Sequence, residues 1–308
     1  MKISIIGSGA VGVEIITYLL NLGSLAQIVL VNRTKAKAEA EILDFSHVSS
    51  FAYSHSVKLS AGDYCDSKDS DIVIITAGAQ IKANQTRDEL LSENSGLIVD
   101  IIQEVETYSP NAIVIIVTNP VDVLTYIAYK NSSYPKERIF SAGTVVDTAR
   151  FMKIVSDKIN IDPKNIFGFV LGEHGKGSMI PWSICNICGL EVDVFCDMND
   201  LPRLDKKDIE KAVLEVGLEI FRKKANTNHG IAASIYRLIK AIVHDENSVL
   251  PVGVFIEDVY GLDDVVLNIP VVINKSGIAK VLKYKLSQNE LEELQNSASK
   301  IKNQIRNV

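Results

Sequence analysis

The chain has 308 residues, of which 47% are hydrophobic and 23% are charged, and its formal net charge is −6 at pH 7. These values are typical of a folded globular protein, and the length corresponds to about two domains of ~150 residues each. The excess of 38 acidic over 32 basic residues, with no run rich in Lys and Arg, argues against nucleic acid and anionic membranes as partners.

The first ten residues, MKISIIGSGA, pass directly into an apolar run and a glycine-rich turn. This start leaves no room for a signal peptide, and no apolar stretch approaches the ~20 residues that a membrane span needs. Four cysteines in a chain of this length do not form a disulfide scaffold. We therefore expect a protein of the reducing cytoplasm with no membrane partner.

The first half of the sequence alternates between short apolar runs and stretches of helix length. The apolar runs, rich in Ile and Val, lie at 3–6, 28–31, 72–76 and 113–118. The helix-length stretches are 11–21, 35–47, 88–108 and 121–131. Strands that are apolar on both faces suit a parallel sheet covered by helices on each side. This βαβ rhythm predicts an α/β protein with a doubly wound parallel sheet.

The second half is less regular. Its pattern predicts helices at 145–159, 206–224, 231–243 and from 288 onward, with strands near 166–171, 180–187, 249–254 and 265–272. The last helix alternates charged with apolar residues, which is typical of an amphipathic helix packed on a core. The chain changes character near 140–143 without a flexible linker. We therefore expect two domains, residues 1–140 and 141–308, that share one interface.

A glycine loop follows the first predicted strand, in the sequence Gly7-Ser8-Gly9-Ala10-Val11-Gly12. Glycines at such a turn let the backbone approach a pyrophosphate, which then sits at the N-terminus of the following helix. The spacing alone is weak evidence, but in the first unit of a βαβ rhythm it indicates a dinucleotide site. We expect Gly7, Gly9, Val11 and Gly12 to contact the cofactor.

An acidic residue is expected about 20 residues after this loop, where it would hold the ribose hydroxyls. Asn32 occupies that place and is followed by Arg33. An acid would repel the extra phosphate of NADP, whereas Asn does not, and Arg33 can pair with that phosphate. The alternative is that Asn32 still bonds the ribose while Arg33 points to solvent. We expect NAD(H) as the cofactor, with NADP(H) tolerated.

Four further segments combine polar residues in a specific order. They are Arg87 just before a predicted helix, Thr118-Asn119-Pro120-Val121-Asp122, Asp147-Thr148-Ala149-Arg150 and Gly172-Glu173-His174-Gly175. With the glycine loop they resemble the lactate/malate dehydrogenase family, and 171–175 is similar to bacterial L-lactate dehydrogenases. The resemblance extends from Gly7 to beyond Thr227. It implies an NAD-binding Rossmann domain over 1–140 and an α+β substrate domain over 141–308.

The implied reaction is the reversible reduction of a 2-oxo acid by NADH to the L-2-hydroxy acid. It requires a proton donor for the carbonyl oxygen and a cation for the carboxylate. His174 suits the first task, since an ordinary histidine pKa of ~6.5 allows proton transfer near neutrality. Arg150 suits the second, because its planar fork binds a carboxylate with two parallel hydrogen bonds. Taken singly, each residue also has an ordinary structural explanation, but the ordered set favours catalysis.

The resemblance also assigns roles to other residues. Asp147 would orient the catalytic histidine and favour its charged form. Arg87 would polarise the substrate carbonyl once its loop closes and excludes water. Asn119, which follows a strand end, would bond both the substrate oxygen and the nicotinamide side of the cofactor. Gly78 is expected at the cofactor, and Thr227 is expected in the wall of the substrate pocket.

By the same resemblance, the loop 78–87 is expected to determine which 2-oxo acid fits. Counting back from Arg87, Ile81 falls where lactate dehydrogenases usually carry Gln and malate dehydrogenases carry Arg. Without that Arg a second carboxylate would be buried unpaired, so malate is disfavoured. Ile81 predicts a substrate with an aliphatic side chain, and here the loop resembles L-2-hydroxyisocaproate dehydrogenases. One methylene changes preference by only ~1–3 kcal/mol, so a true L-lactate dehydrogenase acting on pyruvate is the alternative.

Two rival functions keep most of the same features. A malate dehydrogenase would differ chiefly at Ile81. A non-catalytic nucleotide-binding protein would keep the fold, but the intact catalytic set argues against lost turnover.

For assembly, the resemblance implies a homo-oligomer, and we expect a homotetramer. Activation by fructose 1,6-bisphosphate, which many bacterial lactate dehydrogenases show through an Arg and a His, is not expected because Met152 and Phe167 occupy those positions.

Cys185 and Cys188 form a Cys-x-x-Cys motif in an apolar, strand-like run. A structural zinc site needs four ligands at suitable spacing, and strand alternation would direct these two side chains to opposite faces. We therefore expect no metal site and interpret the two thiols as buried.

Overall fold

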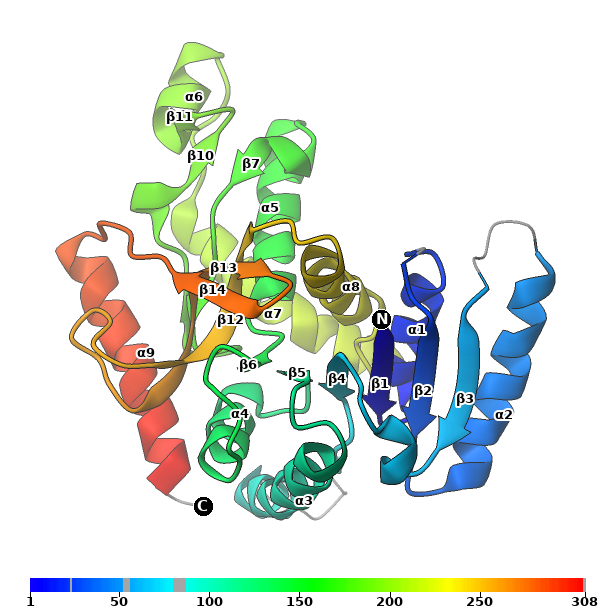
Figure 1. The fold of residues 1–308 in the computed structure, drawn as a ribbon. Coiled ribbons are helices and arrows are strands. Elements are labelled where there is room, and N and C mark those ends of the chain that lie inside the picture. The colour runs from blue at the N-terminus through cyan, green and yellow to red at the C-terminus, as the bar shows by residue number, and fades with distance from the viewer. Residues whose placement is uncertain (23, 52–55, 80–86, 307–308) are drawn as a thin grey trace.

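The computed structural model of the chain describes residues 1–22, 24–51, 56–79 and 87–306, apart from the side chains at positions 49, 87 and 88. Six parallel strands form the N-terminal sheet in the order β3-β2-β1-β4-β5-β6 (Figure 1). They are β1 (Lys2–Ile6), β2 (Gln27–Val31), β3 (Lys58–Gly62), β4 (Ile72–Ile75), β5 (Ile113–Ile116) and β6 (Ile139–Ser141). The central β4 and β5 bury every residue, as expected for strands covered on both faces. The predicted doubly wound sheet is confirmed.

Helices connect the parallel strands and cover the sheet. They are α1 (Ala10–Leu19), α2 (Lys35–Ser46), α3 (Arg87–Tyr108) and α4 (Val121–Lys130), with short 3₁₀ helices at His47–Ser50 and Tyr64–Ser67. The strand order runs outward from β1 in one direction and from β4 in the other. Because such crossovers are right-handed, α1 and α2 lie on one face and α3 and α4 on the other. The carboxyl ends of β1, β4 and β5 therefore meet at one edge, where ligands bind in sheets of this kind.

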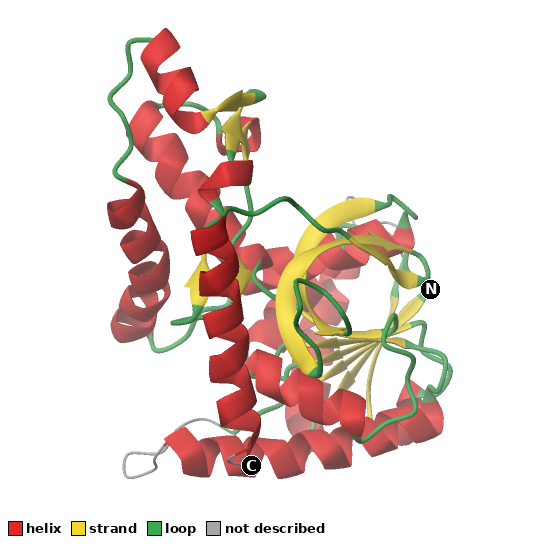
Figure 2. Ribbon diagram, turned by 90° about the vertical axis from the view of Figure 1, so that its left-hand side faces the viewer, coloured by secondary structure: helices red, strands yellow, loops and turns green. Residues whose placement is uncertain are grey.

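The C-terminal part contains helices and antiparallel strands. Its helices are α5 (Val145–Ile159), α6 (Val192–Met198), α7 (Lys206–Lys224), α8 (His229–Val243) and α9 (Gln288–Arg306), with 3₁₀ helices at Pro163–Asn165 and Trp182–Ile184. A five-stranded sheet consists of β12 (Ser248–Ile256), β13 (Val265–Asn274), β14 (Gly277–Val281), β8 (Leu171–Gly172) and β9 (Ser178–Met179). A smaller sheet consists of β7 (Ile166–Phe167), β10 (Asn186–Ile187) and β11 (Leu190–Glu191). The long strands curve beside the parallel sheet, and α9 runs along them (Figure 2).

One large hydrophobic cluster joins the two parts. It contains the parallel strands together with side chains from α8, β12, β13 and α9. Helix α8 packs on α1, and β12 lies beside β6. A second, smaller cluster, which includes the fully buried Phe151, lies between α5, α6, α7 and the three-stranded sheet. The elements that carry the candidate site are thus fixed to a common core.

Some segments differ from the sequence-based expectation. The strands β3 and β6 have weak signals, since one reads KLSAG and the other has only three residues. The strand expected over 180–187 is instead the 3₁₀ helix at Trp182–Ile184 followed by the two-residue β10. Cys185 is buried as expected, but the expectation is wrong for Cys188, which is exposed. Cys188 lies in the turn after β10 with a φ of 51°, where its side chain leaves the strand pattern.

Candidate active site

The glycine loop has the shape that the sequence predicts. Gly7 has a φ of 117°, and a Cβ there would lie 2.7 Å from the backbone nitrogen of Ala77. A Cβ on Gly12 would collide with the carbonyl group of Gly7. Gly9 faces open space, and no described side chain caps the N-terminus of α1 that it precedes. The free N–H groups of that helix end can therefore hold an anion such as a pyrophosphate.

The predicted ribose-binding region follows β2. The Asn32 Nδ2 atom donates to the carbonyl oxygen of Thr34 at 3.1 Å, and this bond fixes the turn. Arg33 is exposed, whereas the neighbouring Lys35 pairs with Asp63 at 3.1 Å. The turn thus presents a neutral amide beside an exposed guanidinium, and no acidic side chain occupies position 32 itself.

Two strand ends carry the predicted residues Gly78 and Asn119. Gly78 packs against the Thr118 side chain so closely that a Cβ would overlap the methyl group. Asn119 precedes α4, and the peptide bond between Asn119 and Pro120 is cis. The buried Asn94 of α3 links these two ends: its Oδ1 accepts from the N–H of Ala79 at 2.7 Å, and its Nδ2 donates to the carbonyl of Asn119 at 3.1 Å. Asn94 has no sequence signal, since it is one polar residue within a long helix.

The structure brings His174, Asp147 and Arg150 together. Asp147 lies in the first turn of α5, and Arg150 follows one turn later. The His174 Nδ1 atom is 2.7 Å from Asp147 Oδ2, and the Arg150 Nη1 atom is 2.8 Å from Asp147 Oδ1. A carboxylate only accepts hydrogen bonds, so Nδ1 carries a hydrogen and Nε2 is left to exchange a proton with a ligand. The expected contact between Asp147 and His174 is present, and Arg150, which is expected at the substrate carboxylate, joins them in one hydrogen-bonded triad.

Burial and charge compete in setting the pKa values of this triad. Burial alone would lower the pKa of His174, but the Asp147 carboxylate outweighs it, and the pKa lies above the ordinary value for histidine. Burial alone would raise the pKa of Asp147, but the positive charges of His174 and Arg150 hold it below the ordinary value. The geometry therefore favours a charged carboxylate beside an imidazole that binds a proton readily.

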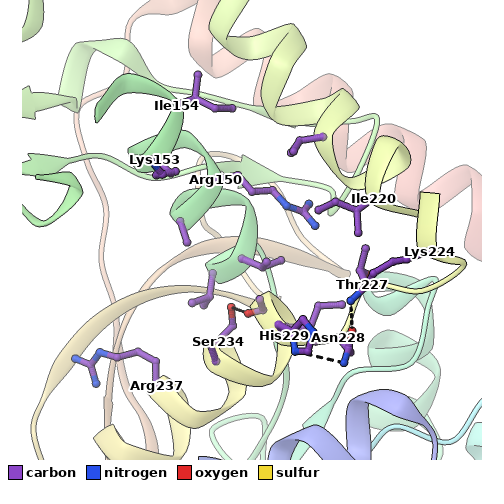
Figure 3. Close-up of a pocket in the computed structure, with 17 residues that line it drawn as sticks. Arg150, Lys153, Ile154, Ile220, Lys224, Thr227, Asn228, His229, Ser234 and Arg237 are labelled. Carbon is purple, nitrogen blue, oxygen red and sulfur yellow. Dashed lines mark hydrogen bonds between the residues drawn. The ribbon is translucent and has the colours of Figure 1, made fainter. Parts of the chain in front are cut away.

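A cavity of about 500 Å³ lies between α5, α7 and α8 (Figure 3). Arg150 and Thr227 line it, together with apolar side chains that include Ile220 and Ile231. A Cβ on Gly217 would lie 3.1 Å from Arg150 Nη1, so this glycine leaves room for the guanidinium beside α7. His174 does not line the cavity, but Asp147 contacts both His174 and Arg150. The cavity thus offers a cation and an apolar wall next to a proton carrier.

Two predicted residues cannot be placed. Ile81 lies outside the described residues. Arg87 begins α3, but its side chain also lies outside them.

Of the helices in the described ranges, none is long and apolar enough to cross a membrane. The same residues contain no group of three or more His, Cys, Asp or Glu side chains that could hold a metal ion.

Comparison with known proteins gives full-length similarity. Residues 1–141 match the family model for the NAD binding domain of lactate/malate dehydrogenase, and residues 144–308 match that for its alpha/beta C-terminal domain. L-lactate dehydrogenase 2 of Clostridium acetobutylicum is 41% identical, over 100% of this chain and 97% of its own. The crystal structure of the minor L-lactate dehydrogenase from Enterococcus mundtii superposes with a TM-score of 0.93 at 31% identity, over 100% and 98% of the chains. A lactate dehydrogenase from a deep-sea metagenome of the Medee basin gives 0.94 at 33% identity, over 99% and 98%.

Proposed function

Since the chain belongs to the lactate/malate dehydrogenase family, we propose that it reduces a 2-oxo monocarboxylic acid to the L-2-hydroxy acid, reversibly and with NADH. The chain is an NAD-dependent dehydrogenase of the lactate type. The single observation that carries the proposed chemistry is the hydrogen-bonded unit of His174, Asp147 and Arg150 at the edge of an apolar cavity. The glycine loop of Gly7, Gly9 and Gly12 would hold NADH, which would supply the hydride.

The residues of this chain perform the remaining tasks. Arg150 binds the substrate carboxylate, with the guanidinium oriented by its bond to Asp147. His174 donates a proton from Nε2 to the carbonyl oxygen as that oxygen becomes an alkoxide. Asp147 stabilises the imidazolium form before this transfer and keeps the ring oriented after it. In the oxidative direction His174 takes the proton back from the hydroxyl group. We assign Arg87 to polarising the carbonyl, and Asn119 and Thr227 to orienting the substrate.

The proposed substrate carries an aliphatic side chain rather than a second carboxylate. Support comes from Ile81, which is uncharged, and from the apolar wall that Ile220 and Ile231 provide beside Arg150. A second carboxylate would find no cation at position 81 and would lose its hydration without compensation. Oxaloacetate should therefore be a poor substrate, with pyruvate the alternative to longer 2-oxo acids.

The test measures kcat/KM with NADH for pyruvate, 2-oxoisocaproate and oxaloacetate on one preparation. We expect the highest value for 2-oxoisocaproate and the lowest for oxaloacetate. Replacement of Ile81 by Gln should shift the ratio toward pyruvate by about tenfold, which is the size of discrimination that one methylene contributes. A wild-type preference for pyruvate would make the enzyme a true L-lactate dehydrogenase, and turnover of none of the three would contradict the proposed function itself.

We propose NAD(H) as the main cofactor, with NADP(H) tolerated. The neutral Asn32 and the exposed Arg33 support this, because neither repels a 2′-phosphate. The variant Asn32→Asp should lower kcat/KM for NADPH by at least about tenfold through charge repulsion. The value for NADH should stay within about twofold, since an acid at this place also bonds the ribose hydroxyls. A wild-type enzyme that does not turn over NADPH would contradict this part of the proposal.

We propose a homo-oligomer, with a tetramer as the expected form. Exposed apolar side chains support this: Leu43 on α2 is 65% exposed, and Leu218 and Phe221 on α7 are also exposed. Sedimentation equilibrium should give a mass above the monomer's 33.8 kDa.

We further propose that fructose 1,6-bisphosphate does not activate the enzyme, since Met152 and Phe167 cannot bind a phosphate. A cytoplasmic location is proposed as well. It is supported by four cysteines that are all free thiols.

A further inference from the structure

The backbone of the catalytic loop is held from three sides. Three consecutive residues each bond to a side chain from a different element, namely β13, α9 and α4. The pairs are Gly172 O with Asn268 Nδ2 (2.6 Å), Glu173 N with Ser297 Oγ (2.6 Å) and His174 N with Asp122 Oδ2 (2.7 Å). Only one of the three supporting side chains, Asp122, carries a charge.

Asp122 is buried more deeply than its charge alone would favour. The residue is 3% exposed, and its second oxygen, Oδ1, accepts a hydrogen bond from Asn268 Nδ2 at 2.8 Å. Burial raises the pKa of the Asp122 carboxyl to about 6, although the hydrogen bonds from His174 and Asn268 oppose this rise. A buried carboxylate is therefore retained at a cost that a neutral side chain of the same shape would avoid.

The charged groups around His174 indicate what the buried Asp122 carboxylate does. The charges of Asp147 and Arg150, both on α5, and of Asp122 on α4 act on the imidazole. Glu173, on the loop itself, lies near Asp122. With Asp122 ionised, its charge and that of Asp147 balance the guanidinium and the imidazolium, so these four groups, without Glu173, sum to zero when His174 holds its proton. With Asp122 neutral, the same four groups sum to zero only when His174 has lost that proton.

We propose that Asp122 is a positioning residue that acts on His174 in two ways, by fixing its backbone N–H and by placing a second negative charge near its imidazole. This inference rests on the proposed function, in which His174 is the proton donor. Asn268 is part of the same device, because it holds the Asp122 carboxylate and the loop carbonyl of Gly172 with one amide group. The expected consequence is a shift in the proton affinity of His174, which a purely structural contact would not produce.

The experiment compares Asp122→Asn with Ser297→Ala in the full chain. NMR titration of the His174 ring, assigned from the signal lost in His174→Gln, should give a pKa lower by about half a unit or more in Asp122→Asn, since one charge near an imidazole has an effect of this size. The alkaline limb of kcat/KM for reduction should move down in pH by the same amount. Ser297→Ala removes a support of the same loop without changing charge. Ser297→Ala should lower kcat but leave unchanged both the pKa of His174 and the position of the alkaline limb of kcat/KM.

Two further measurements guard against a folding defect. Asn268→Ala keeps the Asp122 carboxyl group but removes a hydrogen bond that favours its ionised form. Asp122 should then carry less negative charge at a given pH, and the pKa of His174 should fall, as in Asp122→Asn. Thermal denaturation checks the buried charge. The Asp122 carboxyl ionises at its ordinary pKa of 3.8 in the unfolded chain but at about 6 in the folded chain, so the wild type loses stability as pH rises from about 4 to about 6, and Asp122→Asn lacks this loss. The Tm of the variant relative to wild type should therefore rise over this interval and level off above about pH 7.

An unchanged His174 pKa in Asp122→Asn, with a rate loss matching that of Ser297→Ala, would overturn the proposal and leave Asp122 as a support of the loop only. The NMR titration needs neither substrate nor turnover. Its result therefore stands apart from the substrate assays, and a failure of the proposed function would be recognised separately as a wild-type enzyme without 2-oxo acid reduction.

Discussion

Replacing His174 by Gln lowers kcat for 2-oxo acid reduction by about 10²–10⁴-fold, the range that a positioned general acid contributes. Gln can occupy much of the same space and donate a hydrogen bond to Asp147, but it cannot deliver a proton to the carbonyl oxygen. The affinity for NADH should be retained, because the glycine loop lies on a different element. Steady-state rates and titration of NADH fluorescence measure the two quantities separately.

His244→Gln is the matched control, since His244 ends α8 and takes no part in the proposed site. Its rates should stay within about twofold of wild type, in line with an ordinary surface substitution. A His174→Gln enzyme that kept more than about a tenth of wild-type kcat would remove His174 from the role of proton donor.

The pH dependence of the wild type follows from the raised pKa of His174. Reduction requires the protonated ring, so kcat/KM for the 2-oxo acid should be constant below this pKa and fall as pH rises through it. The Asp147 carboxylate moves that pKa above the ordinary ~6.5. The fall in kcat/KM should therefore be centred at a higher pH than an unperturbed histidine would give. Oxidation of the 2-hydroxy acid requires the neutral ring, so its kcat/KM should rise over the same interval.

Replacing Arg150 by Lys is expected to reduce kcat/KM for the 2-oxo acid by about 10²-fold or more. Lysine keeps the positive charge beside Asp147 but cannot present two parallel N–H groups to a carboxylate. Loss of a buried, charge-assisted contact costs about 2–5 kcal/mol, and most of it should appear as a higher KM. Initial-rate measurements over a wide substrate range separate KM from kcat.

Arg203→Lys is the control, and it tests whether replacing any arginine that pairs with a carboxylate through two N–H groups lowers kcat/KM. Arg203 also forms a two-pronged pair, with Nε 2.9 Å and Nη2 2.5 Å from the Asp197 carboxylate, but it is exposed and precedes α7. An exposed pair contributes about 0–1 kcal/mol, so activity should be unaffected. Equal losses in the two variants would argue against a substrate contact at Arg150.

The sequence allows the parts of the site that depend on local pattern to be predicted. The apolar strands, the glycine loop, and the spacing of Asp147 and Arg150 by one helical turn all follow from periodicity or motif. The supporting residues could not be predicted in the same way. Asn268 meets Asp122 across 146 positions, and Ser297 meets Glu173 across 124, so neither contact has a local signature. Such contacts depend on how the sheets and α9 pack, which single-chain periodicity does not specify.

The hydrophobic cluster shared by the parallel sheet, α8, β12, β13 and α9 limits how this chain can be recombined with its relatives. A chimera joined after β6 would bring together two halves whose facing surfaces evolved in different proteins. The mismatch would fall where α8 meets α1 and where β12 meets β6. A chimera that folds would have to take the matching surface of α1 from the same parent as the C-terminal half. The packed interface, and not either domain alone, is therefore the part that must be kept together.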